Sequence, residues 1–407
     1  MQDIIPSLNV YYVQDLKYAR MFVPNILNAL GIWPSLGKRK SICKRLVDYL
    51  LIFLSYSLIF ASLIPSSLFW VFKGTIRTRV RMFLPLAYTI AAVSKYGILI
   101  LGQDRIRHCV KYIEEDWKNV ANVDARNMMR ESARVGRRLV AISISFYCSS
   151  IMSVRLIPLL YLGKIVDQYN VTIRLLPTPA YLFSLDVQAT PVYEIMYSLQ
   201  GAYGIVTASI STGGIGLITI FVMHACGQLK ILMNLMSEFS EDLQQKEVDK
   251  KLANIVEHQI RIRNFLQLVD HALCQISFLE ISIASLIMSI QSYCILTEFE
   301  NSNSMVIIFF TISYCTATIS VFIFCYVGNQ LILQAEKVAL MSYELEWYRL
   351  PDRKARQLLL VMIMSNKPMT ITAGNFLDLS LKTFCDIVLT MIFLIQNVSI
   401  WKNIFEI

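Results

Sequence analysis

Long apolar stretches alternate with shorter polar and charged ones along the chain. Seven apolar stretches are each long enough for an α-helix to cross a hydrocarbon core roughly 30 Å thick. They cover 46–72, 80–101, 139–162, 191–223, 272–296, 304–333 and 377–401. A membrane β-barrel would instead show segments of about ten residues with alternating hydrophobicity. The pattern therefore predicts an all-α polytopic membrane protein with seven transmembrane helices.

Composition agrees with a membrane protein. Of the 407 residues, 55% are hydrophobic and 16% are charged, whereas soluble domains are nearer 45–50% and about 25%. The pattern divides the chain into a cytoplasmic N-terminal segment (1–45), six transmembrane helices with their connections (46–333), a polar elbow (334–376) and a last transmembrane helix with the C-terminus (377–407).

Lysine and arginine placement predicts the orientation. Segments on the side of the N-terminus hold 28 of these residues, and segments on the opposite side hold 7. Because cytoplasmic loops are enriched in basic residues, the N-terminus is predicted to be cytoplasmic and the C-terminus extracellular. The glycosylation sequon at Asn170 falls in a loop predicted to be outside. A G-protein-coupled receptor has the opposite topology, so that class is disfavoured.

No catalytic or metal-binding motif stands out. The nine cysteines form no CxxC pair, and the four histidines show no metal-ligand spacing. The net charge of +9 is explained by the membrane orientation and not by nucleic-acid binding. The sequence therefore predicts a protein that is not an enzyme and that needs no cofactor.

Cytoplasmic segments have the periodicity of helices. In 225–270, apolar residues recur at spacings of three and four positions, as at Leu229, Leu232, Met233 and Met236. Two interpretations remain open. The membrane helices extend into the cytoplasm and pack on each other, or these extensions form an interface between subunits.

Two charged residues lie within predicted spans, Lys95 and Arg155. A charge in the membrane normally faces a cavity, a partner or the membrane interface. Both could reach the interface, and Arg155 could instead cap a polar outer vestibule.

Aromatic, small and hydroxyl-bearing residues recur at helical spacing in the outer halves of the second, third, fourth and sixth spans. Ordinary packing explains any one of them, but as a set they suit an apolar pocket with a few hydroxyl groups. The candidate ligand-binding residues are Pro85, Tyr88, Thr89, Ala92, Tyr147, Ser150, Ile151, Val154, Pro158, Gly201, Gly204, Ala208, Phe310, Thr311 and Tyr314.

The region from Tyr326 to Trp401 resembles the insect odorant receptor family. The matching residues are Cys325-Tyr326, Gly328, Tyr343, Trp347-Tyr348, the run Arg353–Met364, Lys367-Pro368, Thr372-Ala373-Gly374, Leu379-Ser380-Leu381 and Thr383-Phe384. The inverted seven-span plan extends the likeness over the whole chain. Where the family often has a Tyr/Ser-rich middle in the last span, this chain has Met391, Ile392 and Phe393.

The resemblance implies a subunit of an odorant-gated cation channel in the plasma membrane of olfactory sensory neurons. It implies a heterotetramer with co-receptor subunits, and a small volatile organic ligand. The short segment 225–270 indicates a tuning receptor and not the longer co-receptor. The resemblance further implies an anchor for assembly with Tyr343, Trp347, Tyr348, Pro368 and Gly374, and a pore gate near Leu394, Asn397, Val398 and Trp401.

Two alternative functions remain at this stage. A gustatory-type ligand-gated channel would have the same plan, although the Trp347-Tyr348 pair favours the odorant branch. A transporter is disfavoured because seven spans do not divide into two repeats.

Overall fold

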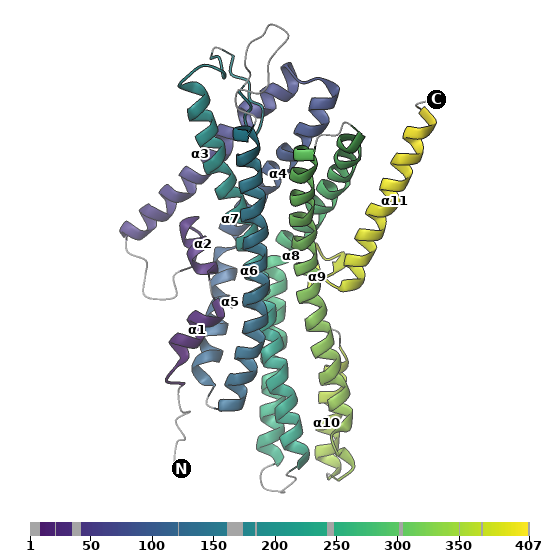
Figure 1. The fold of residues 1–407 in the computed structure, drawn as a ribbon. Coiled ribbons are helices and arrows are strands. Elements are labelled where there is room, and N and C mark those ends of the chain that lie inside the picture. Colours follow the sequence, from purple (N-terminus) through teal and green to yellow (C-terminus); the bar gives the residue numbers. More distant parts are fainter. Residues whose placement is uncertain are drawn as a thin grey trace.

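Long helices make up most of the structure, a computed structural model that describes residues 9–20, 22–34, 42–120, 122–160, 174–183, 185–241, 248–300, 304–349, 351–367 and 369–405. Figure 1 shows them running side by side along one axis. In chain order the elements are α1 (Tyr12–Arg20), α2 (Val23–Ala29), α3 (Ile42–Phe72), α4 (Ile76–Leu101), α5 (Gln103–Asn119), α6 (Val123–Leu160), α7 (Val192–Glu241), α8 (Val248–Glu300), α9 (Ser304–Glu344), η1 (Trp347–Arg349), α10 (Asp352–Asn366), β1 (Thr372–Ala373), β2 (Leu377–Asp378) and α11 (Leu381–Phe405).

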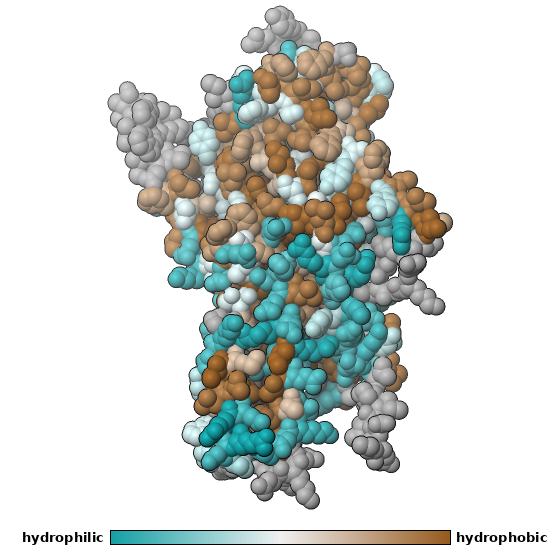
Figure 2. Space-filling view, turned by 180° about the vertical axis from the view of Figure 1, so that it is seen from behind, coloured by the Kyte–Doolittle hydropathy of each residue, from teal (hydrophilic) through white to brown (hydrophobic). Residues whose placement is uncertain are grey.

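Six of the described helices are long and apolar enough to cross a membrane: α3, α4, α6, α7, α8 and α9. Residues with hydrophobic side chains cover one half of the molecule and hydrophilic residues cover much of the other half (Figure 2). This division fits a bundle with one end in lipid and the other in water. The seventh predicted span corresponds to α11, and its crossing of the membrane remains a prediction.

Four helices extend well beyond the predicted spans. α6 begins at Val123 and not at 139, α7 continues to Glu241 and not to 223, α8 begins at Val248 and not at 272, and α9 continues to Glu344 and not to 333. The added segments carry charges, but their apolar faces pack on each other, as the buried Leu229, Leu252 and Ile255 show. Extension and mutual packing of the helices, one of the two interpretations left open, therefore describes this subunit.

α7 lies at the centre of the bundle. Most of its apolar window is buried, and small residues allow close contacts with its neighbours. A Cβ at Gly216 would meet Val23, and one at Gly213 would meet Leu27. Both partners belong to α2, so the two glycines let this short helix lie directly against α7.

A β-hairpin connects α10 to α11. Its turn has positive φ at both Gly374 (66°) and Asn375 (61°), as a type I′ turn requires. The hairpin packs against α8, where the Thr372 amide donates to Asp270 Oδ1 at 2.8 Å and the Gly374 amide donates to the Cys274 carbonyl at 3.2 Å. These contacts fix the place where α11 starts.

Candidate functional site

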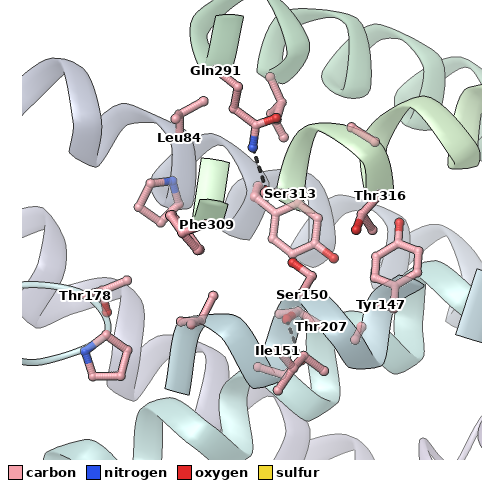
Figure 3. A pocket seen from close by; sticks show the side chains of 18 of the residues that line it. Leu84, Tyr147, Ser150, Ile151, Thr178, Thr207, Gln291, Phe309, Ser313 and Thr316 are labelled. Atoms are coloured by element: carbon pink, nitrogen blue, oxygen red, sulfur yellow. Dashed lines mark hydrogen bonds between the residues drawn. The ribbon is translucent and has the colours of Figure 1, made fainter. Parts of the chain in front are cut away.

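A cavity of about 430 Å³ lies inside the apolar half of the bundle. Its wall is built by α4, α6, α7, α8 and α9, with Pro177–Pro179 of the preceding extended segment at one side. Figure 3 shows Gln291 and Ile151 approaching the cavity from opposite sides, with Thr178 and Tyr147 at its two ends. Concave sites of this size and character are typical of small-molecule binding.

Most of the wall is apolar. Leu84, Ile287 and Phe310 are buried in one hydrophobic cluster and face the cavity with Phe309 and Val154. Such a surface favours a molecule that is itself mostly hydrocarbon, because burial of apolar area contributes roughly 25 cal/mol per Å².

A buried ion pair forms the floor of the cavity. Lys95 Nζ on α4 lies 2.6 Å from Glu280 Oε2 on α8, and both side chains are almost fully buried. Lys95 also donates to Ser211 Oγ at 2.9 Å, and the Tyr147 hydroxyl donates to Glu280 Oε1 at 3.3 Å. Lys95 therefore pairs inside the protein and does not extend to the membrane interface, the alternative that its sequence position allowed.

Hydroxyl groups extend this network to every helix around the cavity. Tyr147 Oη lies 3.0 Å from Ser320 Oγ on α9, and Tyr88 Oη lies 3.3 Å from Ser211 Oγ on α7. Each charged group thus has partners, as buried charges require.

Arg155 lies at the wall between α6 and α7. Its guanidinium donates to the Tyr197 carbonyl at 2.8 Å and lies 4.1 Å from the centre of the Tyr197 ring. The guanidinium passes so close to Gly201 that a Cβ there would overlap it. Arg155 faces the cavity, which agrees with the vestibule alternative.

Ten of the fifteen predicted ligand-binding residues line this cavity. They are Pro85, Tyr88, Tyr147, Ser150, Ile151, Val154, Gly201, Gly204, Ala208 and Phe310.

The remaining five lie outside the lining. Thr89 is buried one layer behind it and shares a 2.5 Å hydrogen bond with Tyr203, which does line the cavity. Ala92 and Pro158 are buried elsewhere. Thr311 is exposed and donates to the Ile307 carbonyl, and Tyr314 packs in a cluster with Met288 and Met391. Their spacing was correct for a helix, but the bundle turns these positions away from the cavity.

The other predicted sites are placed as follows. Leu394 is exposed on α11. Asn397, Val398 and Trp401 lie at the end of α11, where the side chains are outside the described part of the chain. Tyr343, Trp347 and Tyr348 are all more than half exposed. Gly374 forms the hairpin turn, and Asn170 and Pro368 lie outside the described residues.

α8 contributes a side of the cavity that sequence reasoning missed. Glu280, Ala284, Ile287 and Gln291 line it, and their spacing of four, three and four positions places them on one helical face. A carboxylate and an amide on that face, within an apolar run, were the signal that could have revealed it.

A second polar cluster lies at the hydrophilic end of the bundle. Asp116 on α5 accepts from Arg261 Nε at 2.7 Å and lies 2.9 Å from His224 Nε2. Burial works to raise the pKa of Asp116, but the hydrogen bond and charge of His224 and the charge of Arg261 outweigh it and lower that pKa below its ordinary value. Among the described residues, no group of three or more His, Cys, Asp or Glu side chains is arranged to hold a metal ion.

Two solved structures of an insect receptor have a similar fold. The insect olfactory receptor OR5 from Machilis hrabei, solved in complex with eugenol, matches with a TM-score of 0.79 over 96% of this chain and 99% of that chain, at 13% sequence identity. A second structure of the same receptor matches with a TM-score of 0.75. At this identity the likeness shows a shared fold.

Two curated proteins with similar sequences are also insect odorant receptors. Odorant receptor 10 of Aedes albopictus is 22% identical over 52% of this chain and 56% of its own length. Odorant receptor 13a of Drosophila melanogaster is 24% identical over 72% of this chain and 73% of its own length. The chain spans about half the length of the first of these relatives.

A family model decides the assignment. The model described as 7tm Odorant receptor matches residues 75–392, which include every helix that lines the cavity and about half of α11. The resemblance predicted from Tyr326–Trp401 is therefore confirmed. The chain belongs to the 7tm odorant receptor family and is a multi-pass membrane protein, not an enzyme.

Proposed function

We propose that this chain is a tuning subunit of an odorant-gated, non-selective cation channel. It would act in the plasma membrane of olfactory sensory neurons, in a heterotetramer with co-receptor subunits. The observation that carries the proposal is the largely apolar cavity of about 430 Å³ inside the membrane half of the bundle. A relative with this fold was solved in complex with eugenol, which supports a small organic ligand for this chain.

Ten of the fifteen candidate residues named from the sequence lie at the cavity wall, and these ten form the proposed ligand site. A ligand of roughly ten heavy atoms at ~0.5 kcal/mol per atom would gain ~5 kcal/mol, within the range for small ligands. That gain corresponds to sub-millimolar affinity. A volatile molecule of about ten heavy atoms can therefore bind in the cavity with sub-millimolar affinity.

The ligand's limited binding energy constrains gating. Moving a two-state equilibrium from 1:99 to 99:1 requires about 5.5 kcal/mol of differential affinity. A small odorant supplies little more than that in total. The closed and open states must therefore differ by only a few kcal/mol in the absence of the ligand.

α11 is the proposed pore wall. It extends away from the main bundle in Figure 1 and exposes Leu389, Ile392, Phe393 and Leu394. In an isolated subunit such a face needs lipid or a neighbouring subunit as a cover. The gate would lie at Leu394, Asn397, Val398 and Trp401, near the predicted extracellular end, and Asn170 would be glycosylated on that side.

Assembly is proposed to use the anchor residues Tyr343, Trp347 and Tyr348. Their aromatic side chains are 54%, 51% and 66% exposed at the hydrophilic end, which supports a contact with another subunit. Gly374 and Pro368 would direct the chain from this anchor into α11.

Co-expression with the co-receptor tests the proposal. Currents should appear under one or more members of an odorant panel and should reverse near the potential of a non-selective cation pore. A chain that reaches the cell surface with its co-receptor and stays silent across a broad panel would contradict the proposal. Responses confined to sugars or bitter solutes would instead support the gustatory-type alternative.

A further inference from the structure

Gln291 has one polar atom without a partner in the apolar wall of the cavity. The side chain is 3% exposed, and its Nε2 donates to Ser313 Oγ at 2.6 Å (Figure 3). Its Oε1 finds no hydrogen-bond partner among the described residues. The amide is thus half satisfied, and the free half is an acceptor.

No donor in the described part of the chain pairs with Gln291 Oε1. Its neighbours on α8, Ile287, Ile290 and Cys294, belong to the hydrophobic cluster that also holds Leu84 and Phe310. A buried carbonyl oxygen without a partner costs free energy that a donor can recover. Because Gln291 lines the cavity, a bound molecule beside this side chain can supply that donor.

The other polar groups of the cavity constrain the chemistry of the ligand less. Lys95, Glu280 and Tyr147 already bond to one another or to serine hydroxyls. The Thr178 hydroxyl also lacks a partner among the described residues, but a hydroxyl can rotate and either donate or accept. Gln291 Oε1 can only accept, so it requires a hydrogen-bond donor on the ligand.

We propose that the receptor selects neutral odorants with a hydroxyl group, alcohols or phenols, through donation of that hydroxyl to Gln291 Oε1. The hydrocarbon part then lies against Leu84, Ile287 and Phe309. The inference rests on the proposed function in one respect: the cavity is where the odorant binds. An ether, ester or hydrocarbon of the same size leaves the Gln291 oxygen buried and unpaired.

Two isomers separate the hydroxyl from size and apolar area: n-octanol and heptyl methyl ether. They have the same heavy atoms, and only the alcohol can donate. The full-length receptor with its co-receptor is measured in two ways, by half-maximal concentration for current and by ligand-induced rise of the thermal unfolding temperature. One neutral hydrogen bond with a buried acceptor predicts about a tenfold preference for the alcohol.

Variants assign the preference to one side chain. Gln291→Met keeps the length of the side chain and removes the acceptor, so the two isomers should become equal within about twofold. Ser292→Ala is the matched control, since Ser292 is buried on the same helix, donates to the Met288 carbonyl and does not line the cavity. It should keep the tenfold preference.

The outcomes distinguish this inference from the proposed function. Thermal shifts that favour the alcohol without any current would contradict channel function and leave the recognition of the hydroxyl intact. Currents of equal sensitivity to both isomers in the wild type would overturn the inference and leave channel function intact. A preference for the ether, no thermal shift with either isomer, or an alcohol preference that survives in Gln291→Met would also overturn the inference.

Discussion

Lys95 Nζ lies 2.6 Å from Glu280 Oε2, and the two side chains are 3% and 6% exposed. The pair joins α4 to α8 beneath the cavity, 185 positions apart in the sequence. Tyr147 and Ser211 bond to the same two groups, so α6 and α7 are connected through them. The ion pair beneath the proposed ligand site therefore links four helices of the bundle.

Removing one member of this pair should destabilise the receptor strongly. Lys95→Met leaves the Glu280 carboxylate buried without its counter-charge, and such changes cost roughly 3–5 kcal/mol. The double variant Lys95→Met with Glu280→Met should cost less than either single variant, since no charge then remains buried. Thermal unfolding of the purified receptor measures both, and a double variant that is as unstable as the sum of the two singles would contradict the pairing.

The position of the Arg155 side chain should require a glycine at residue 201. A methyl group at Gly201 would overlap the Arg155 guanidinium, whereas one at Gly204 would meet nothing within 4 Å. Gly201→Ala should therefore displace Arg155 from Tyr197 and change odorant sensitivity severalfold, at a stability cost of about 1–3 kcal/mol. Gly204→Ala, also at the cavity wall, is the matched control for stability, and equal unfolding temperatures for the two variants would count against this placement of Arg155.

Gly328 should be intolerant of any side chain. A Cβ there would overlap the carbonyl of Leu379, which is backbone of the segment between the hairpin and α11. Gly328→Ala should move the start of α11 and remove most of the receptor from the cell surface. Gly97→Ala is the control, because its added methyl group would meet only the Tyr56 hydroxyl at an ordinary 3.6 Å. Normal surface expression and current from Gly328→Ala would show that this close approach is unimportant.

The contacts of Asp116 with His224 and Arg261 predict that the receptor loses stability at acid pH. Its pKa is lower in the folded protein than its ordinary value, so the unfolded state binds more protons as the pH falls. The contribution of Asp116 is thus complete above the unfolded pKa of about 3.9 and is lost as the pH falls through the lower folded pKa.

Asp116→Asn tests this linkage. It should cost about 1–3 kcal/mol at neutral pH and should flatten the loss of stability below about pH 4. Unfolding temperatures measured from neutral to acid pH give both quantities. An unchanged acid profile in the variant would remove Asp116 as the cause.

Sequence periodicity predicted the helices well because each membrane helix must be continuously apolar over its span. It also indicated helices in the cytoplasmic segments, but it left open whether α6, α7 and α8 pack on each other there or form an interface between subunits, because packing partners are not visible in the sequence. The hairpin turn at Gly374 and Asn375 is explained by residue types that accept positive φ.

Sequence reasoning was also limited in predicting which residues line the cavity. Helical spacing selects Tyr88 on α4 and Tyr147 and Ile151 on α6, and all three line the cavity. Thr311 and Ala92 satisfied the same spacing but face elsewhere, because the rotation of each helix about its axis depends on neighbours. Glu280 and Gln291 were missed because only the fold shows that α8 faces the cavity.

Filling the cavity tests the central claim that an odorant binding there opens the channel. Gly204 lines the cavity and has open space around the position of an added Cβ, so Gly204→Phe should occupy part of the cavity. The measurement is the odorant dose–response of the variant co-expressed with the co-receptor, alongside wild type at matched surface expression. The account predicts at least a tenfold loss of sensitivity to odorants that open the wild-type channel. An unchanged dose–response with the cavity filled would contradict it.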